Sequence, residues 1–322
     1  MLERIEGDEA ARLFLGHLGL GRRVAGPEFL QDLAMGFARL PYENISKIIK
    51  SAETSASGAI RPLESMRLPR EVAGDHIERG LGGTCFSLTF FLERVLKSLG
   101  FDAYKVMADM NSGPNVHCLV VVSEGGSHYM LDPGYALYRV IDLPEGPDRG
   151  APGSGSSSSG HGTGVVAPSG ADAGSRPTRR VICPHAEVEV VNEGIGAYSL
   201  WTDDAAGRRR RYRFRDHPVS DRDFEGHWED SFGRPTLNNI CLTRMTDKGH
   251  IYLRKDFFKF SSRDSVDKRR LSGDIERFVR DEFGIGEEWT ARAREILRAR
   301  RSPGRSPQTP AWPGNAFDGG RV

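Results

Sequence analysis

The sequence lacks an excess of charge of either sign. Its 322 residues include 45 Lys and Arg against 44 Asp and Glu, which leaves a formal net charge of +1. A protein that binds nucleic acid or an anionic membrane surface through its overall field carries a clear basic excess. The composition therefore predicts no nucleic-acid partner and no membrane partner, and we expect small-molecule or local partners instead.

Long apolar runs are missing too. No stretch approaches the roughly 20 apolar residues that a bilayer-spanning helix requires. The first residues, from Met1 to Asp8, carry acidic side chains where a secretory signal would be basic. We therefore expect no membrane segment and a cytoplasmic location.

Cysteine is scarce, with four residues in the whole chain, Cys85, Cys118, Cys183 and Cys241. They are too few and too scattered for a disulfide framework, and no C-x-x-C pair indicates structural zinc. Cys183-Pro-His185 offers two metal ligands, but no second pair at a suitable spacing accompanies it. We expect reduced thiols and no metal site. The Gly-rich run 153–164 contains no G-x-G-x-x-G motif, so we interpret it as a linker and not as a phosphate-binding loop.

Two segments have the composition of unfolded chain. Residues 145–180 contain nine Gly, seven Ser and four Pro, which predicts a flexible insertion. Residues 301–322 have the same character and predict a disordered tail. A chain of this length also exceeds the usual size of a single core, so two or three packed substructures are expected between these segments.

Helical spacing of apolar residues is confined to the two ends of the folding part. The ranges 10–18 and 27–40 near the N-terminus, and 271–283 and a second helix from Glu287 near the C-terminus, follow this spacing. The clearest helix begins at Cys85 and is expected to end at Gly100. One face of that helix is apolar: Leu88, Phe91, Leu92, Val95, Leu96 and Leu99.

Strand-like segments dominate the middle of the chain. A Glu124-Gly125-Gly126-Ser127 turn predicts a hairpin between two of them. The β-rich composition and alternation predict strands at 103–108, 117–122, 128–131, 187–191, 211–215, 239–244, 251–253 and 257–260. We expect these to form an antiparallel sheet.

Cys85 lies in Gly80-Leu-Gly-Gly-Thr-Cys-Phe, so a glycine-rich turn delivers a thiol to the first turn of the clearest helix. A helix N-terminus has unpaired N–H groups and a partial positive charge, which favour the thiolate and so make the sulfur more nucleophilic. The alternative is that Cys85 is a small buried hydrophobe, as expected for the other three cysteines. The glycine turn and the helix start favour a catalytic cysteine.

A base and a carboxylate follow on adjacent predicted strands. His117 begins the first strand and Asp132 ends the second, across the Gly125-Gly126 turn. A lone His at a strand start is usually a satisfied polar group, and Asp before Pro-Gly is an ordinary turn residue. Together with Cys85 they form the arrangement expected of a Cys-His-Asp catalytic triad.

These residues resemble the arylamine N-acetyltransferase family. Its Pro-Phe-Glu-Asn segment, its Arg-Gly-Gly-Tyr-Cys-Phe-Glu nucleophile turn, its strand-initial His and its Asp-Val-Gly-Phe have counterparts in order over about residues 25–285. The counterparts are Pro41-Tyr42-Glu43-Asn44, Gly82-Gly83-Thr84-Cys85-Phe86, His117 and Asp132-Pro133-Gly134-Tyr135. The stretches 235–244 and 249–253 also resemble the family's third domain. The resemblance implies an α+β fold that combines an N-terminal helical bundle, an antiparallel β-barrel and a C-terminal α/β lid around the Cys-His-Asp core.

On this basis we expect a helical bundle at 1–84, the nucleophile helix and barrel at 85–215, a lid domain at 216–300 and the tail at 301–322. The resemblance implies an acyltransferase that moves an acetyl or other acyl group from coenzyme A through acyl-Cys85 to an amine. No cofactor would be bound permanently, because acetyl-coenzyme A or another acyl-coenzyme A is a co-substrate. Basic residues at 208–211 and 292–301 either meet coenzyme A phosphates or solvate the surface, and solvation is the favoured interpretation.

Departures from the family pattern surround the nucleophile. Leu81 occupies the position of the family's Arg, and Ser87 and Thr89 replace its Glu and Asn. We hypothesise that Glu43 pairs with Arg79 instead, two residues before Leu81. The changed surroundings leave three alternatives to arylamine acetylation: an amide synthase, a thiol hydrolase or transglutaminase-like enzyme, and a non-catalytic ligand-binding relative.

Overall fold

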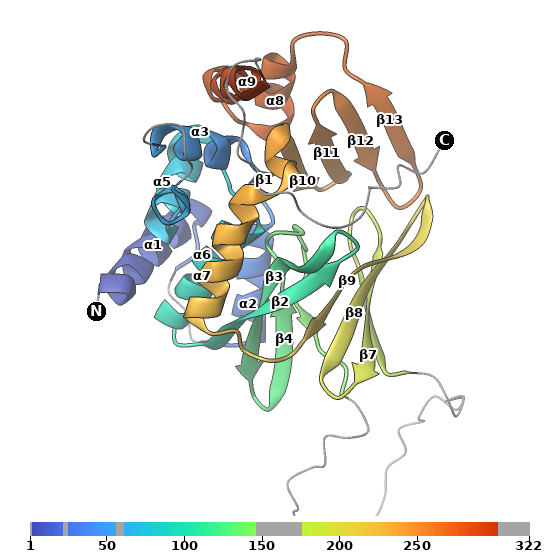
Figure 1. Ribbon diagram of the computed structural model, residues 1–322. Helices are drawn as coiled ribbons and strands as arrows, with labels where there is room; N and C mark the ends of the chain where they lie inside the picture. Colours follow the sequence, from blue (N-terminus) through green and yellow to red (C-terminus); the bar gives the residue numbers. More distant parts are fainter. Residues whose placement is uncertain (1, 22–24, 56–60, 146–175, 302–322) are drawn as a thin grey trace, which may run out of the picture.

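The computed structural model describes residues 2–21, 25–55, 61–145 and 176–301, and the first part of this chain is helical (Figure 1). The helices predicted in the ranges 10–18 and 27–40 and from Cys85 are all present. The bounds are α1 Leu2–Leu18, α2 Pro27–Phe37, α3 Ile45–Glu53, α4 Pro62–Ser65, α5 Pro69–Arg79 and α6 Cys85–Ser98. Most of the predicted insertion and all but the first residue of the predicted tail lie outside the described residues.

An antiparallel sheet of eight strands follows the helices, in the order β5-β4-β3-β2-β9-β8-β7-β6. Its edge strands approach each other, since Arg179 of β6 forms an ion pair with Asp142 of β5. The sheet therefore curls into a nearly closed barrel, as the family resemblance implied. The strands are β2 Asp102–Met110, β3 Gly113–Glu124, β4 Ser127–Leu131, β5 Ile141–Asp142, β6 Thr178–Ile182, β7 Glu187–Gly194, β8 Ala197–Asp204 and β9 Gly207–Arg215.

The predicted hairpin joins β3 to β4. Gly125 and Gly126 form its turn with φ of 59° and 83°, the left-handed values that a two-residue turn of this kind requires. In the register of the hairpin, Val120 pairs with Leu131. The end of β4 therefore lies beside the middle of β3, which brings Asp132, just after β4, close to His117. Because β3 begins at Gly113, His117 lies within the strand and not, as the sequence had predicted, at its start.

The C-terminal part contains a second, five-stranded sheet with helices packed beside it (Figure 1). Its order is β1-β10-β11-β12-β13, so the edge strand β1, Tyr42–Glu43, comes from the N-terminal part of the chain. The other elements are α7 Asp221–Asp230, the 3-10 helices η2 Ser231–Gly233 and η3 Pro235–Asn238, β10 Cys241–Thr246, β11 Gly249–Arg254, β12 Phe257–Ser261, β13 Val266–Arg270, α8 Ile275–Phe283 and α9 Glu287–Arg301.

The predicted α+β fold class is confirmed, and the eight strands expected from the sequence are all present. Five others, β1, β5, β6, β8 and β13, were missed. Strands β1 and β5 have two residues each, which is too short for any alternation. Strand β8 buries Ser199 and Thr202 beside Tyr198 and Leu200, so its residues do not alternate simply between apolar and polar. Strand β13 is almost entirely charged, and its pairing with β12 decides its conformation.

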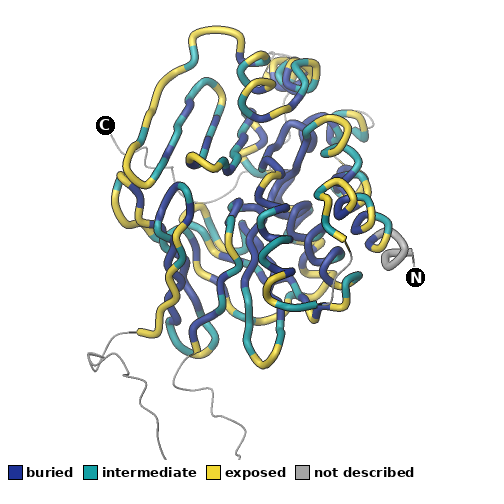
Figure 2. The backbone as a smooth tube through the Cα atoms, turned by 180° about the vertical axis from the view of Figure 1, so that it is seen from behind, coloured by how far each residue is buried: buried dark blue, intermediate teal, exposed yellow. Residues whose placement is uncertain are grey.

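Helix α6 lies at the centre of the molecule, with α1 and α5 on one side and β2 and β3 on the other. Its side chains Phe91, Leu92, Val95 and Leu96 are buried, as the apolar stripe predicted. Gly100, just beyond the helix end, has a φ of 90°. The buried residues gather where the helices meet the strands, and the exposed residues gather at turns and at the ends of hairpins (Figure 2).

None of the helices in the described ranges combines the length and the apolar character needed to cross a bilayer.

Gly80 connects α5 to the turn before Cys85. A substitution at Gly80 therefore tests how tightly that turn is packed. It has a φ of 69°, and a Cβ added there would collide with the backbone oxygen of Gly284. We expect Gly80→Ala to lower the free energy of unfolding by about 1–3 kcal/mol, because strain and overpacking combine. The control is Gly74→Ala within α5, where a Cβ meets nothing within 4 Å and should stabilise the protein by about 0.5–1 kcal/mol. Urea unfolding measures both, and equal effects would contradict the packing argument.

Candidate active site

The turn before Cys85 is fixed by the backbone of the Pro41–Glu43 segment. Gly83 N donates to Pro41 O at 3.3 Å, and Glu43 N donates to Gly83 O at 3.0 Å. A Cβ at Gly82 would collide with Pro41 O, so the close approach requires glycine there. Cys85 is thereby held at the first position of α6, where the partial positive charge of the helix terminus favours a thiolate.

His117 and Asp132 meet as the hairpin register requires. The Nε2 atom of His117 lies 2.7 Å from Oδ2 of Asp132, and both residues are buried. The same Oδ2 accepts a hydrogen bond of 2.6 Å from the hydroxyl of Tyr212, and Oδ1 accepts one of 2.8 Å from Tyr135 N. Each carboxylate oxygen is therefore satisfied, and Asp132 fixes both the position and the orientation of the imidazole.

The structure brings Cys85 to the same place. Its Sγ lies 4.0 Å from Val116 O, and a hydrogen bond with His117 lowers the pKa of the thiol. Because Nε2 of His117 faces Asp132, the other ring nitrogen, Nδ1, is the one available to the sulfur. Gly134 passes close by, because a Cβ there would lie 2.6 Å from Cys85 Cβ and 3.2 Å from His117 Cε1. All three residues predicted as the triad thus lie together in the order Cys85, His117, Asp132.

Electrostatics at this site favour a charged pair. Burial opposes the charge of His117, but the charge and hydrogen bond of Asp132, together with those of Cys85, raise its pKa to about 10. A hydrogen bond with Cys118, followed by the hydrogen bond and charge of His117, holds the pKa of Cys85 well below its ordinary value in spite of burial. The expected resting state is a thiolate beside an imidazolium.

Cys118 is a neighbour that sequence reasoning missed. It is buried, as predicted, and burial together with a hydrogen bond to the Cys85 thiol raises the pKa of Cys118 well above its ordinary value. Thr89, at the position of the family's Asn, donates to the backbone oxygen of Cys118 at 3.0 Å. The only hint in the sequence was that Cys118 is next to His117. That neighbourhood brings Cys118 close to Cys85 only because β3 packs against α6.

The hypothesis that Glu43 pairs with Arg79 is wrong. Glu43 pairs with Arg67, at 3.5 Å between Oε1 and Nη1, and both side chains are almost completely buried. Arg79 is 40% exposed and pairs with Asp75 and Glu78 on its own helix. The reason is the direction of α5: its last turn points Arg79 outward, whereas Arg67 precedes the helix and runs beneath the turn.

Arg67 ties the Glu43 segment to the turn before the nucleophile. Its guanidinium donates to Gly82 O, to Ser46 Oγ at 2.7 Å and to Asp75 Oδ2, each at no more than 2.7 Å. The family pattern has its Arg at the position of Leu81, so in this chain a different segment supplies the guanidinium that meets Glu43. Sequence reasoning could not select Arg67, because no motif includes it.

Asn44 fastens the same segment to the C-terminal part. Its side-chain nitrogen donates to Thr236 O at 2.9 Å and to Asn239 O at 2.8 Å. Its side-chain oxygen accepts a hydrogen bond of 2.8 Å from Cys241 N. Glu43 and Asn44 therefore both lie beside the nucleophile turn, as the resemblance implied. In the described part of the chain, no group of three His, Cys, Asp or Glu is placed to hold a metal ion.

Comparisons with known proteins identify what the chain is similar to. A model of the N-acetyltransferase family matches residues 27–148. The fold resembles that of the arylamine N-acetyltransferase from Mycobacterium abscessus, with a TM-score of 0.66 and 15% identity over 89% of this chain and 94% of that one. The M. smegmatis enzyme gives a TM-score of 0.62 and 18% identity over 88% and 97%. The Nocardia farcinica enzyme gives 0.62 and 19% over 89% and 95%. No curated protein matches the chain.

The family resemblance predicted from the sequence is therefore confirmed, and the fold is shared over most of the chain. The family match covers helices α2 to α6, the turn before Cys85, the strand that carries His117 and the segment that holds Asp132. The similar structures extend the likeness through the five-stranded sheet and the C-terminal helices.

Removing Arg67 tests the buried network. In Arg67→Met the Glu43 carboxylate loses its partner in a fully buried position, so we expect a loss of about 3–5 kcal/mol of stability. Burial already raises the pKa of Glu43 against the opposing charge of Arg67, so the loss should shrink at acid pH, where protonation removes the buried charge. Arg79→Met is the control, since an exposed pair contributes about 0–1 kcal/mol. Denaturant unfolding at neutral and acid pH measures the free energy of unfolding of each variant. An Arg67→Met loss that does not change with pH would contradict the role of the buried Glu43 charge.

The ionisation of Cys85 predicts how its reactivity depends on pH. Because its pKa is depressed, the thiolate stays populated as the pH falls below about 8.5, the ordinary pKa of a thiol. We expect iodoacetamide to alkylate Cys85 at pH about 6 at least tenfold faster than a model thiol, and His117→Gln to abolish this advantage. Peptide mass spectrometry follows Cys85 separately from the other cysteines. A rate equal to that of the model thiol would disprove the charged pair.

Proposed function

We propose that this chain is an acyltransferase that moves an acetyl or other acyl group from coenzyme A to an amine through a thioester on Cys85. The observation that carries the proposal is the continuous contact from Cys85 through His117 to a fully hydrogen-bonded Asp132 at the start of α6. The family match over residues 27–148 and the shared arylamine N-acetyltransferase fold support it.

In the first half-reaction, the Cys85 thiolate attacks the carbonyl carbon of the acyl thioester. A bond forms between that carbon and the cysteine sulfur, and the bond to the sulfur of coenzyme A breaks. His117 gives its proton to the departing thiolate, and Asp132 holds the ring so that Nδ1 faces the reacting sulfur. Backbone N–H groups in the first turn of α6 have no partner within the helix, and they are the candidates for stabilising the oxyanion.

In the second half-reaction, the amine nitrogen attacks the thioester carbon and Cys85 leaves as a thiolate. His117, now neutral, takes the proton that the amine loses, and the charged pair is restored. An arylamine or hydrazine suits this step, because it is unprotonated and nucleophilic near neutral pH. The proposal assigns acyl-coenzyme A the role of co-substrate and requires no permanently bound cofactor.

Intact-mass spectrometry tests the first half-reaction. Mixing the protein with a panel of acyl-coenzyme A thioesters should add the mass of one acyl group, and Cys85→Ser should abolish this addition. Asp132→Asn should lower the acylation rate by about 10⁴-fold, the effect of the equivalent change in a serine-histidine-aspartate triad. The absence of any Cys85-dependent adduct across the panel would favour a non-catalytic relative.

The second half-reaction is tested with an acceptor. Acylated protein is mixed with an aromatic amine or a hydrazine, and chromatography quantifies the amide against the free acid. We expect the amide to exceed the acid, because the proposal makes an amine and not water the acceptor. Free acid alone, with or without the amine, would favour a thiol hydrolase.

A further inference from the structure

Lys47, on the first turn of α3, is buried next to the turn that precedes the nucleophile. Its side chain is 5% exposed, its Nζ donates to Ser231 Oγ at 2.5 Å, and the ammonium lies 3.8 Å from the centroid of the Phe232 ring. Among the described residues, no carboxylate forms an ion pair with it. Burial of an ammonium without a carboxylate partner is costly, so a nearby negative charge would stabilise its charged form.

Other lysines of the chain show what an ordinary partner looks like. Lys105 is equally buried, but it lies 2.6 Å from Glu93 Oε2 and 2.7 Å from Asp221 Oδ1. Lys50, one turn further along α3, lies 2.5 Å from Glu71 Oε2. Lys47 differs from both, because its only direct partners are a hydroxyl and an aromatic ring.

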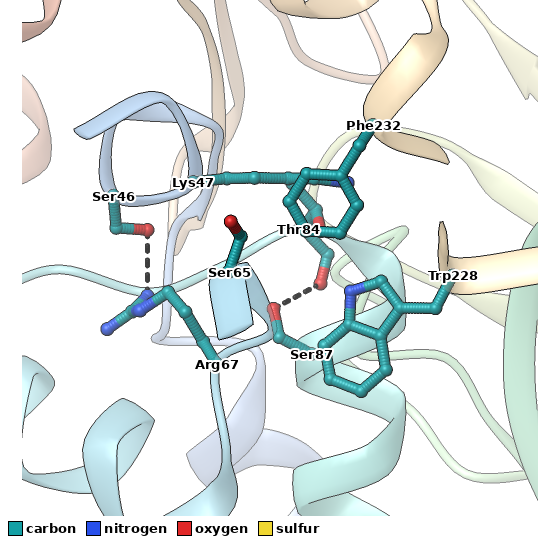
Figure 3. Close-up of a pocket in the computed structure, with 8 residues that line it drawn as sticks. All are labelled: Ser46, Lys47, Ser65, Arg67, Thr84, Ser87, Trp228 and Phe232. Atoms are coloured by element: carbon teal, nitrogen blue, oxygen red, sulfur yellow. Dashed lines mark hydrogen bonds between the residues drawn. The ribbon is translucent and has the colours of Figure 1, made fainter. Parts of the chain in front are cut away.

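The cavity beside Lys47 is too small to admit an organic anion. Its volume is about 10 Å³, which is room for about one water molecule. Figure 3 shows its lining residues, Ser46, Lys47, Ser65, Arg67, Thr84, Ser87, Trp228 and Phe232. Thr84 is the residue immediately before Cys85. An organic anion therefore does not reach the Lys47 ammonium through this cavity.

The charged and titratable groups around Lys47 come from several elements. Arg67, from the segment between α4 and α5, lines the same cavity and is neutralised by Glu43 and Asp75. Arg234, just beyond η2, adds positive charge and is itself influenced by Asp230. The groups that act in the opposite direction on Lys47 are the thiols of Cys85 and Cys118. Of these two, Cys85 is the one that ionises, because the pKa of Cys118 is raised.

We propose that Lys47 is a positioning residue for the nucleophile: its ammonium is the second cation, beside the His117 imidazolium, that stabilises the Cys85 thiolate, and it loses that counter-charge whenever Cys85 is acylated. The first part depends only on Cys85 being ionised. The second part rests on the proposed acyl-enzyme, in which a neutral thioester replaces the thiolate.

A consequence concerns protons. Burial and the nearby Arg234 lower the pKa of Lys47 to about 7, against the raising effect of the Cys85 thiolate. Acylation removes that raising effect, so Lys47 should release its proton to solvent when the thioester forms near neutral pH. The His117 proton leaves separately with the coenzyme A thiol, so the release to solvent reports on Lys47.

The first experiment measures alkylation of Cys85 by iodoacetamide between pH about 5 and 9 in the full chain. Lys47→Met should raise the apparent pKa of Cys85 and slow alkylation at pH about 6 by about tenfold, which corresponds to one pKa unit. Lys47→Arg should restore the rate, because arginine keeps its charge, and should remove any inflection near pH 7. Lys50→Met, on the same helix, is the matched control and should leave the profile unchanged.

A profile that is identical in the wild type and Lys47→Met would overturn the proposal. If Lys47→Met fails to fold by circular dichroism, the comparison of wild type with Lys47→Arg decides, and an unchanged inflection then contradicts it. A change in KM for donor or acceptor without any change in alkylation would mean that Lys47 contacts substrate, and it would also overturn the proposal.

The second experiment measures proton release with an indicator dye on mixing with acetyl-coenzyme A near pH 7. The wild type and Lys50→Met should release more protons per acyl group than Lys47→Arg, and equal release would contradict the second part. Absence of acylation in all variants, combined with the expected shift in alkylation, would disprove the proposed function and leave the role of Lys47 toward the thiolate intact.

Discussion

The structure depends on one close backbone contact, in which the turn from Gly80 to Cys85 packs against the Pro41–Glu43 segment. Gly83 exchanges hydrogen bonds with both ends of that segment, and Gly82 allows the two backbones to touch. The same segment forms the edge strand of the C-terminal sheet, and the turn begins the helix that the barrel strands cover. Helices, barrel and C-terminal sheet therefore meet at this point, and the nucleophile is located there because all three fix its backbone.

Buried charge surrounds this contact, and its arrangement explains the chemistry of the site. Beneath the turn, the charge of Arg67 neutralises that of Glu43. This pair therefore fixes the position of the turn and does not change the ionisation of Cys85. Above it, Asp132 pairs with His117, whereas Lys47 contacts a hydroxyl and an aromatic ring. With one carboxylate beside two cations, the Cys85 thiolate is the group that balances the charge.

The departures from the family pattern acquire a physical meaning in this setting. Leu81 brings no guanidinium to the nucleophile turn, but Arg67 pairs with Glu43 and donates to Gly82 O. Thr89 in place of Asn still binds the strand that carries His117. Ser87 in place of Glu binds the backbone of the turn at Thr84 O. In this chain these residues therefore fix the nucleophile turn through hydrogen bonds of their own, although they differ from the family pattern.

The sequence by itself determined the central helix, eight of the strands and the choice of Cys85, His117 and Asp132 as candidates, because these depend on short-range patterns. The apolar stripe of α6 and the Gly125-Gly126 turn require only local spacing, and that turn dictates that His117 and Asp132 meet. Strands such as β8 and β13 could not be predicted, since buried polar residues or surface charge erase their alternation. Arg67, Lys47 and Cys118 were decided by the tertiary structure alone. Each acts on the nucleophile across a long stretch of chain, and a pairing of that kind exists only after the helices, the barrel and the C-terminal sheet have packed together.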